Sequence, residues 1–197
     1  MGRIAEIAGL LLGLLYLWLE YRADWKLWIV SIIMPINSLY VYWNAGLYAD
    51  FTIDIYYVLI AVYGYYVWRH GGHKGTERPI VRTPRMAWPL LFAASVLLWV
   101  GIAQTLIHFT PSTVPWWDAL NTALSIVAMW MLARKWVEQW LVWLVVDAVS
   151  AALYVRKGIP FYAVLYTIYV PIAWLGYLRW LRKMKTAPED EALKNAE

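Results

Sequence analysis

The residue best placed to do chemistry is Asp147, a lone carboxylate in a run of otherwise apolar residues. In a helix its face also carries Trp140 and Trp143 before it, because steps of three and four residues return to the same side. Ser150 and Tyr154 continue that face after it. A carboxylate near the middle of a bilayer costs about a few kcal/mol and needs a partner. With aromatic walls from Trp140 and Trp143 and a further contact from Tyr154, the pattern predicts a buried site for a small organic cation.

Polar residues in two other apolar segments are candidates to complete this site. Asp54 and Tyr57 share one helical face, and Asn121 and Ser125 share another. We expect these four residues to be second-line ligand contacts. The alternative is structural, because small polar residues in membranes often only bond helices together. We expect no metal site and no cofactor.

The composition indicates a membrane protein. The chain of 197 residues is 62% hydrophobic and 15% charged, which is too apolar for a soluble domain of this size. The 15 Trp and 15 Tyr fit extensive membrane interfaces, where amphipathic rings collect. No cysteine is present, which excludes a disulfide framework and a thiolate nucleophile.

Seven apolar segments are each about long enough to cross a bilayer as a helix. They cover residues 4–21, 26–43, 49–68, 87–107, 116–133, 138–155 and 160–180. We predict an all-α protein with two parallel three-helix bundles joined by a linker helix. The expected parts are a first bundle (1–68), a cytoplasmic loop (69–86), a linker helix with an outer loop (87–115), a second bundle (116–180) and a cytoplasmic tail (181–197).

The basic residues set the predicted orientation. Of the 17 Lys and Arg residues, fourteen fall on one side of the seven segments, and only Arg3, Arg156 and Lys157 fall on the other. Because basic loops stay in the cytoplasm, the N-terminus is expected outside and the C-terminus inside. The net charge of +4 therefore reports topology, and we expect no nucleic-acid partner.

An internal repeat relates the first three segments to the last three. Three short motifs recur in the same order: residues 25–28 match 140–143, residues 64–68 match 176–180, and residues 46–47 match 158–159. One segment between two three-helix units restores the starting side, so the two repeats are expected to be parallel. Transporters built in this way bind substrate at the repeat interface near the bilayer midplane.

The sequence contains none of the common enzyme signatures. Residues 71–76 hold Gly and Lys but lack the spacing of a P-loop, and no metalloprotease or serine hydrolase motif occurs. We therefore expect a protein that is not an enzyme and whose transport is either facilitated diffusion or coupled to an ion.

The chain resembles the PnuC-type vitamin transporter family over nearly all of residues 5–182. The resemblance rests on five stretches, namely residues 46–50, 63–68, 117–125, 138–143 and 153–158. It implies a fold like that of SWEET transporters and uptake of nicotinamide riboside across a bacterial inner membrane. It also implies a cytoplasmic kinase that traps the product, and a homo-oligomer, for which a trimer is the candidate.

Three positions depart from the pattern of the family members that handle nicotinamide riboside. Asp54 and Met129 stand where those members typically have Gln, and Asp147 stands where they have Asn. Carboxylates only accept hydrogen bonds, whereas amides also donate them. Thiamine, which a related branch of the family carries, is also a monocation and stays open as the alternative vitamin. A membrane subunit that does not transport is the further alternative.

Overall fold

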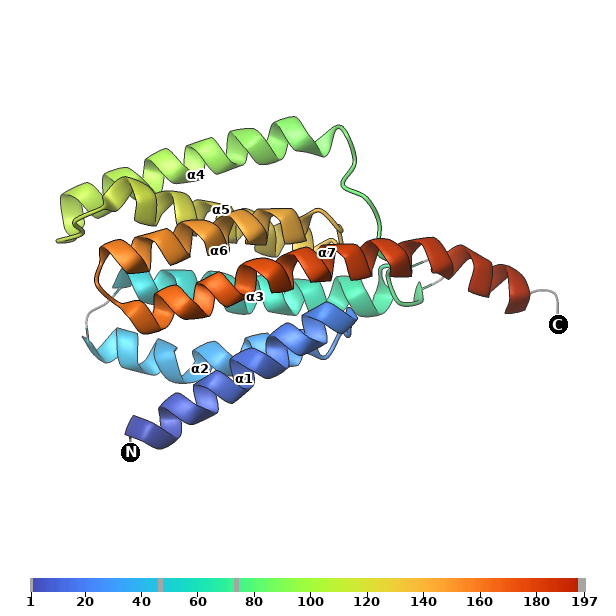
Figure 1. Cartoon of the computed structure of the whole chain (residues 1–197), viewed down its shortest axis with the longest axis horizontal. Coiled ribbons are helices and arrows are strands. Elements are labelled where there is room, and N and C mark those ends of the chain that lie inside the picture. The colour runs from blue at the N-terminus through green and yellow to red at the C-terminus, as the bar shows by residue number, and fades with distance from the viewer. Residues whose placement is uncertain (1, 46–47, 73–74, 195–197) are drawn as a thin grey trace. The chain divides into compact units, whose positions relative to one another are not determined.

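The computed structural model describes residues 2–45, 48–72 and 75–194, and within them the chain forms seven helices and no strand. The helices are α1 (Gly2–Arg22), α2 (Leu27–Ala45), α3 (Tyr48–His70), α4 (Ala87–Phe109), α5 (Pro115–Ala133), α6 (Gln139–Arg156) and α7 (Pro160–Lys194) (Figure 1). Each covers one predicted apolar segment, so the seven-helix prediction is confirmed, and α7 continues beyond its predicted end at residue 180 to Lys194.

Four helical stretches in the described part are long and apolar enough to cross a membrane: Phe51–His70, Ala87–Phe109, Gln139–Arg156 and Pro160–Thr186. α5 carries Asp118, Asn121 and Thr122 among its apolar residues. A bilayer-spanning helix satisfies its own backbone hydrogen bonds, which explains why long apolar runs adopt this structure. The protein is therefore an all-α, multi-pass membrane protein.

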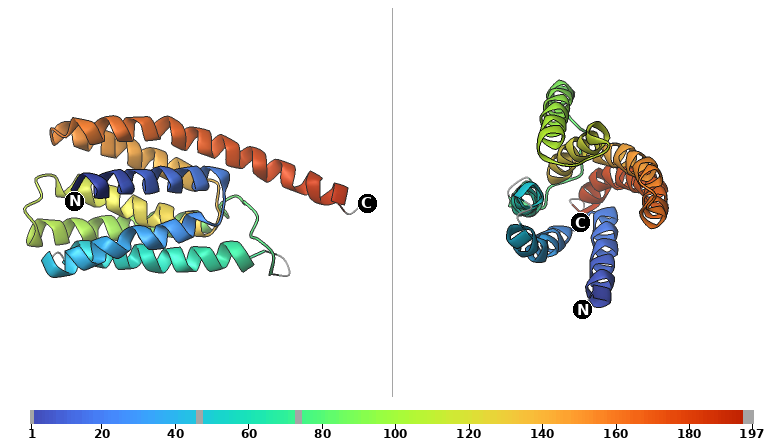
Figure 2. Two further views of the ribbon diagram at one scale, coloured as in Figure 1. Left: turned by 90° about the horizontal axis from the view of Figure 1, so that it is seen from below. Right: turned by 90° about the vertical axis from the view of Figure 1, so that its left-hand side faces the viewer.

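The helices form two compact units. The first unit consists of residues 1–79 and 133–135, and the second of residues 80–132 and 136–197. In the first unit α2 packs on both α1 and α3. In the second, α6 packs along α7, and the two run side by side in both views of Figure 2. α4 joins α5 through a buried cluster that includes Leu91 and Met131.

A tryptophan ring lies on a glycine in each unit. In the second unit the ring of Trp140 (α6) covers Gly176 and meets the ring of Trp180 (both α7) edge to face, with centroids 5.8 Å apart. In the first unit Trp28 (α2) covers Gly64 in the same way and meets Trp68 at 5.6 Å. These residues recur at one constant interval along the chain, which supports the internal repeat.

The structure corrects the sequence alignment of the repeat in one respect. Trp28, and not Trp25, is the counterpart of Trp140, because only Trp28 makes the contact with glycine. The third motif pair includes Gly46 and Leu47, which lie outside the described residues.

The turns before α2 and α6 share the same unusual backbone. Ala23 and Lys135 have positive φ angles of 55° and 58°, in the left-handed region that normally favours glycine. In each turn the next residue donates its N–H five residues back, from Asp24 to Leu19 and from Trp136 to Met131. This bond is typical of a Schellman helix end, which satisfies carbonyls that the helix leaves open. The repeat therefore extends to backbone geometry.

Lys135 belongs to the first unit and is almost fully buried there, with 3% of its surface exposed. Its ammonium group lies 4.4 Å from the ring centroid of Trp68, and its Nζ donates to Oε1 of Glu77 over 2.7 Å. A buried ammonium needs such a partner, because desolvation of an unpaired charge is costly. The side chain of Lys135 thus helps to hold the turn in which its own backbone has a positive φ angle.

Glu138 anchors the loop before α4 within the second unit. Its carboxylate accepts from Nη1 of Arg82 over 3.1 Å, and from the N–H and hydroxyl of Thr83 over 2.7 and 2.9 Å. The hydrogen bonds that Arg82 makes to Glu138 and Tyr177 raise the pKa of its guanidinium. A buried carboxylate with three donors is well satisfied, so this loop is fixed to the start of α6.

We expect Gly176→Ala to destabilise the second unit. The added Cβ would lie 2.7 Å from the ring of Trp140, so the ring must move, and overpacking of this kind costs about 1–3 kcal/mol. Thermal unfolding of the purified protein in detergent measures the loss. Gly101→Ala in α4 is the matched control, because nothing lies within 4 Å of its added Cβ. Equal melting temperatures for the two variants would contradict the proposed packing.

Candidate functional site

Asp147 lies in the middle of α6 with only 7% of its surface exposed. Tyr166 and Tyr169 on α7 lie close enough to interact with its charge. Among the residues that the structure describes, no hydrogen bond or ion pair to its carboxylate is present. A buried carboxylate without a protein partner is costly, so an external cation would balance it favourably.

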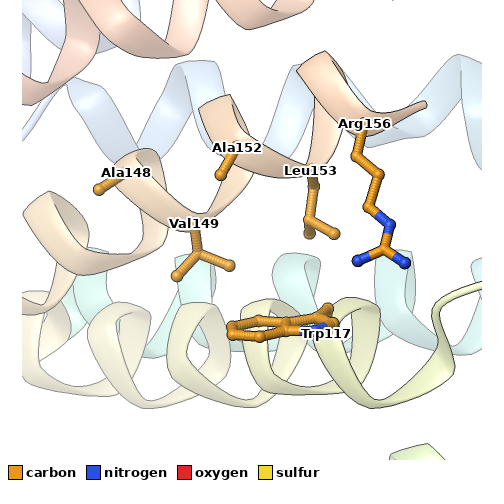
Figure 3. Close-up of a pocket in the computed structure, with 6 residues that line it drawn as sticks. All are labelled: Trp117, Ala148, Val149, Ala152, Leu153 and Arg156. Carbon is orange, nitrogen blue, oxygen red and sulfur yellow. The ribbon is translucent and has the colours of Figure 1, made fainter. Parts of the chain in front are cut away.

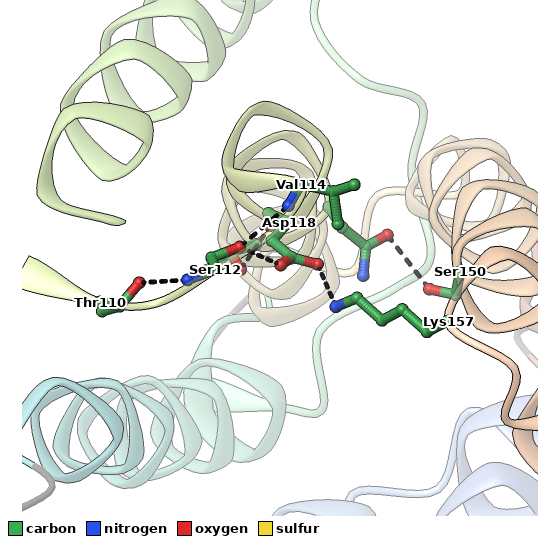
Figure 4. A network of polar contacts seen from close by, with 8 residues as sticks. Thr110, Ser112, Val114, Asp118, Ser150 and Lys157 are labelled. Carbon is green, nitrogen blue, oxygen red and sulfur yellow. Dashed lines mark hydrogen bonds and ion pairs between the residues drawn. The ribbon is translucent and has the colours of Figure 1, made fainter. Parts of the chain in front are cut away.

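A hydrogen bond between α5 and α6 lies one turn from Asp147. Ser150, 1% exposed, donates its Oγ hydrogen to Oδ1 of Asn121 over 3.2 Å (Figure 4). The hydroxyl of Ser125 donates to the backbone carbonyl of Asn121 over 2.9 Å. The amide nitrogen of Asn121 keeps two hydrogens with no partner among the described residues. The predicted contacts Asn121 and Ser125 are therefore brought together with Ser150, and a donor remains for a ligand.

Four tyrosines of the second unit form a row of rings. Tyr154 of α6 stacks on Tyr162 and Tyr166 of α7, with centroid distances of 5.2 and 5.4 Å. Tyr166 meets Tyr169 at 5.7 Å in an edge-to-face contact. Tyr162 is 47% exposed, whereas Tyr166 and Tyr169 lie near the buried Asp147. The row thus leads from an exposed ring to the carboxylate.

The two tryptophans predicted to flank Asp147 have different surroundings. Trp140 is 2% exposed and packs on Gly176 and Trp180, so its ring joins helices. Trp143 is only half-buried and lies one turn from Asp147. Its indole N–H is buried and without a partner in the described part of the chain. A ligand contact remains a prediction for both residues, and Trp143 has the freer ring.

Asp54 and Tyr57 lie on α3 and are described within the first unit alone. They are close enough for the charge of Asp54 to act on the Tyr57 hydroxyl, and Oδ2 of Asp54 is buried with no partner among the described residues. α1 contributes a further carboxylate, Glu20, which is buried and accepts a hydrogen bond from Tyr16. Sequence reasoning missed Glu20 because it lies near the end of its apolar segment.

Sequence reasoning also missed Tyr162, Tyr166 and Tyr169. Their spacing of four and three residues puts them on one face of α7, which was a usable signal. The internal repeat gave a second signal. The interval that separates Trp28 from Trp140 also leads from Asp54 to Tyr166, and from Tyr57 to Tyr169.

An ion pair joins the ends of α5 and α6. Nζ of Lys157 lies 2.7 Å from Oδ1 of Asp118, and Ser112 donates its hydroxyl hydrogen to Oδ2 of Asp118 over 2.9 Å (Figure 4). Both groups are partly exposed, so the pair contributes little stability by itself. It joins the two helix ends and does not reach the carboxylate of Asp147.

Comparison with known proteins identifies the family. The model of the nicotinamide mononucleotide transporter family matches residues 3–182. The nicotinamide riboside transporter PnuC of Escherichia coli K12 is 22% identical over 205 residues, which cover 91% of this chain and 86% of the relative. The riboflavin/roseoflavin transporter RibM of Streptomyces davaonensis is 30% identical over 182 residues, which cover 89% of this chain and 84% of the relative.

A solved structure shares the fold. The crystal structure of the vitamin B3 transporter PnuC superposes with a TM-score of 0.66 and 24% identity, covering 90% of this chain and 80% of that one. The predicted resemblance to PnuC-type transporters is confirmed. Since the family model spans nearly the whole chain, this seven-helix protein belongs to the nicotinamide mononucleotide transporter family.

Proposed function

We propose that this protein imports a small cationic B vitamin or its nucleoside precursor by facilitated diffusion across a bacterial inner membrane, with nicotinamide riboside as the substrate. The observation that carries the proposal is the buried carboxylate of Asp147, which has no protein counter-charge among the described residues and lies beside tyrosine rings. The pyridinium of nicotinamide riboside is a flat aromatic cation. It fits charge attraction to Asp147 and cation–π contact with Tyr166.

Polar groups beside Asp147 match the rest of that substrate. The free amide hydrogens of Asn121 can donate to a carboxamide oxygen of the substrate. The neighbouring hydroxyl of Ser150 can make contacts with the hydroxyl groups of a ribose. Trp143 adds a ring whose N–H has no partner among the described residues, and Trp140 is a further contact in this proposal. The contacts expected from Asp54 and Tyr57, which lie in the first unit, stay predictions. Relatives named as nicotinamide riboside transporters support the same substrate.

Thiamine is the second candidate, because Asp147 is a carboxylate where members that handle the riboside typically have an amide. The aminopyrimidine of thiamine has an amino group that needs an acceptor, and a carboxylate accepts but cannot donate. Riboflavin, which RibM is named for, is neutral. It would leave the charge of Asp147 without a counter-ion, so the site favours a cation over it.

Facilitated diffusion has one consequence for the cell in this proposal. Net uptake continues only while the concentration of free substrate inside the cell stays low, so a cytoplasmic kinase that phosphorylates the substrate would trap the product.

We also propose a homo-oligomer, with a trimer as the form to be tested. The mass of the intact assembly measured by native mass spectrometry would decide that point.

We expect proteoliposomes containing the protein to take up labelled nicotinamide riboside faster than empty liposomes, and faster than they take up riboflavin. Asp147→Asn should weaken binding of the riboside by about tenfold, equivalent to about 1.4 kcal/mol, because the cation loses its counter-charge. Isothermal titration of nicotinamide riboside and of thiamine measures the affinities.

Asp118→Asn is the control for the loss of a carboxylate, because Asp118 pairs with Lys157 at the helix end instead of facing Asp147. It should keep the affinity of the unmodified protein. An unchanged affinity in folded Asp147→Asn protein would remove Asp147 from the site. No flux for either vitamin would instead favour a subunit that does not transport.

We expect the ring of Tyr166, and not its hydroxyl, to contribute to binding. Tyr166→Leu should weaken the affinity for nicotinamide riboside by about fivefold, since a cation–π contact is worth about 0.5–2 kcal/mol. Tyr166→Phe keeps the ring and should bind within about twofold of the unmodified protein, by the same reasoning. Equal losses in both variants would point to the hydroxyl, and no loss in either would exclude the ring.

The proposed orientation places the α4–α5 loop outside and the loop before α4 in the cytoplasm. Because the chain has no cysteine, single cysteines can report this without background. With a membrane-impermeant maleimide, we expect Thr113→Cys to be labelled in intact spheroplasts and Arg85→Cys only after lysis. Both residues are exposed. The reverse labelling pattern would invert the topology.

A further inference from the structure

A groove of about 360 Å³ lies between α5 and α6 of the second unit. Five of the six residues that line it are apolar, and the sixth is charged: Trp117, Ala148, Val149, Ala152, Leu153 and Arg156. Figure 3 shows Ala148 at one end of the row, Arg156 at the other, and the ring of Trp117 facing Val149 and Leu153. Its volume is within the range of about 300–1,000 Å³ that ligand sites occupy.

The groove lies on a different face of α6 from the vitamin site. Ala148, Ala152 and Arg156 follow one another at intervals of four residues and are all exposed. Asp147 and Ser150, in contrast, are buried. Small side chains at 148 and 152 leave room against the ring of Trp117. The occupant of the groove therefore meets the outer surface of the helix, which faces the bilayer.

Arg156, at the charged end of the groove, has no anionic partner among the described residues. Lys157, the next residue, takes the carboxylate of Asp118 at 2.7 Å. A guanidinium at the end of a membrane helix pairs well with phosphate, which it can bind through two parallel hydrogen bonds.

We propose that this groove binds one anionic phospholipid, with its phosphate on Arg156 and an acyl chain along Ala152, Ala148 and Trp117. Charge complementarity and the apolar wall together select this occupant. A free phosphate ion would contact Arg156 but gain nothing from the apolar wall. Under the orientation proposed above, the lipid belongs to the outer leaflet. The site is separate from vitamin binding and does not depend on which vitamin is carried.

Native mass spectrometry of the full chain in detergent, titrated with phosphatidylglycerol, tests the proposal. We expect one retained lipid per chain. Arg156→Ala should lower its retention by about fivefold, the effect of losing one basic contact to an anionic lipid. Ala152→Phe should fill the groove and remove the lipid as well. The matched controls are Arg85→Ala, which removes an exposed arginine elsewhere, and Val155→Phe, which adds a ring to α6 outside the groove.

Two further ligands, measured in the same titration, identify the occupant of the groove. Diacylglycerol, which lacks the phosphate, and inorganic phosphate, which lacks the chains, should both bind far more weakly than phosphatidylglycerol. Unchanged nicotinamide riboside affinity and melting temperature in Arg156→Ala show that the fold and the vitamin site are intact. Equal lipid retention by all four variants would overturn the proposal. So would dissociation of an oligomer by Ala152→Phe without loss of lipid, because the groove would then be a contact between copies.

Discussion

The contact between a tryptophan ring and a glycine is the interaction on which both units depend. In a bilayer, apolar side chains gain little by facing each other instead of lipid, so helices associate through close packing and polar contacts. Gly176 lets the ring of Trp140 lie directly on the backbone of α7, and Gly64 does the same for Trp28 on α3. Holding α6 against α7 in this way is what places Asp147 beside the tyrosines of α7.

The two repeats share this packing but differ in chemistry. At the interval that relates Trp28 to Trp140, the counterpart of Asp147 is the buried Pro35, and the counterpart of Asp54 is Tyr166. The two repeats thus place these two carboxylates on helices that do not correspond, Asp147 on α6 and Asp54 on α3. The charged positions therefore do not follow the internal repeat, although the packing of tryptophan on glycine does.

The helices could be predicted because long apolar runs leave few alternatives in a membrane, and Asp147 could be predicted because a charge stands out in such a run. Tyr166 and Tyr169 were missed because tyrosine is common in this chain, so their residue type alone does not distinguish them from the other tyrosines. The sequence alignment matched Trp25 instead of Trp28 to Trp140, and this error has a geometric cause. Tryptophans three residues apart allow the alignment to slip by nearly one helical turn without losing the match. Only contact with Gly64 distinguishes them.

The turn at Lys135 has a consequence for how the protein is made. Residues 133–135 belong to the first unit, although the rest of that unit ends at residue 79. As the chain leaves the ribosome, α1, α2 and α3 can pack from local contacts alone. Glu77 and the ring of Trp68 then still lack their contacts with the ammonium group of Lys135, which is synthesised only after α4 and α5. The contacts of the first unit are therefore complete only after Lys135 has been synthesised, and a chain truncated before α5 would lack this last contact.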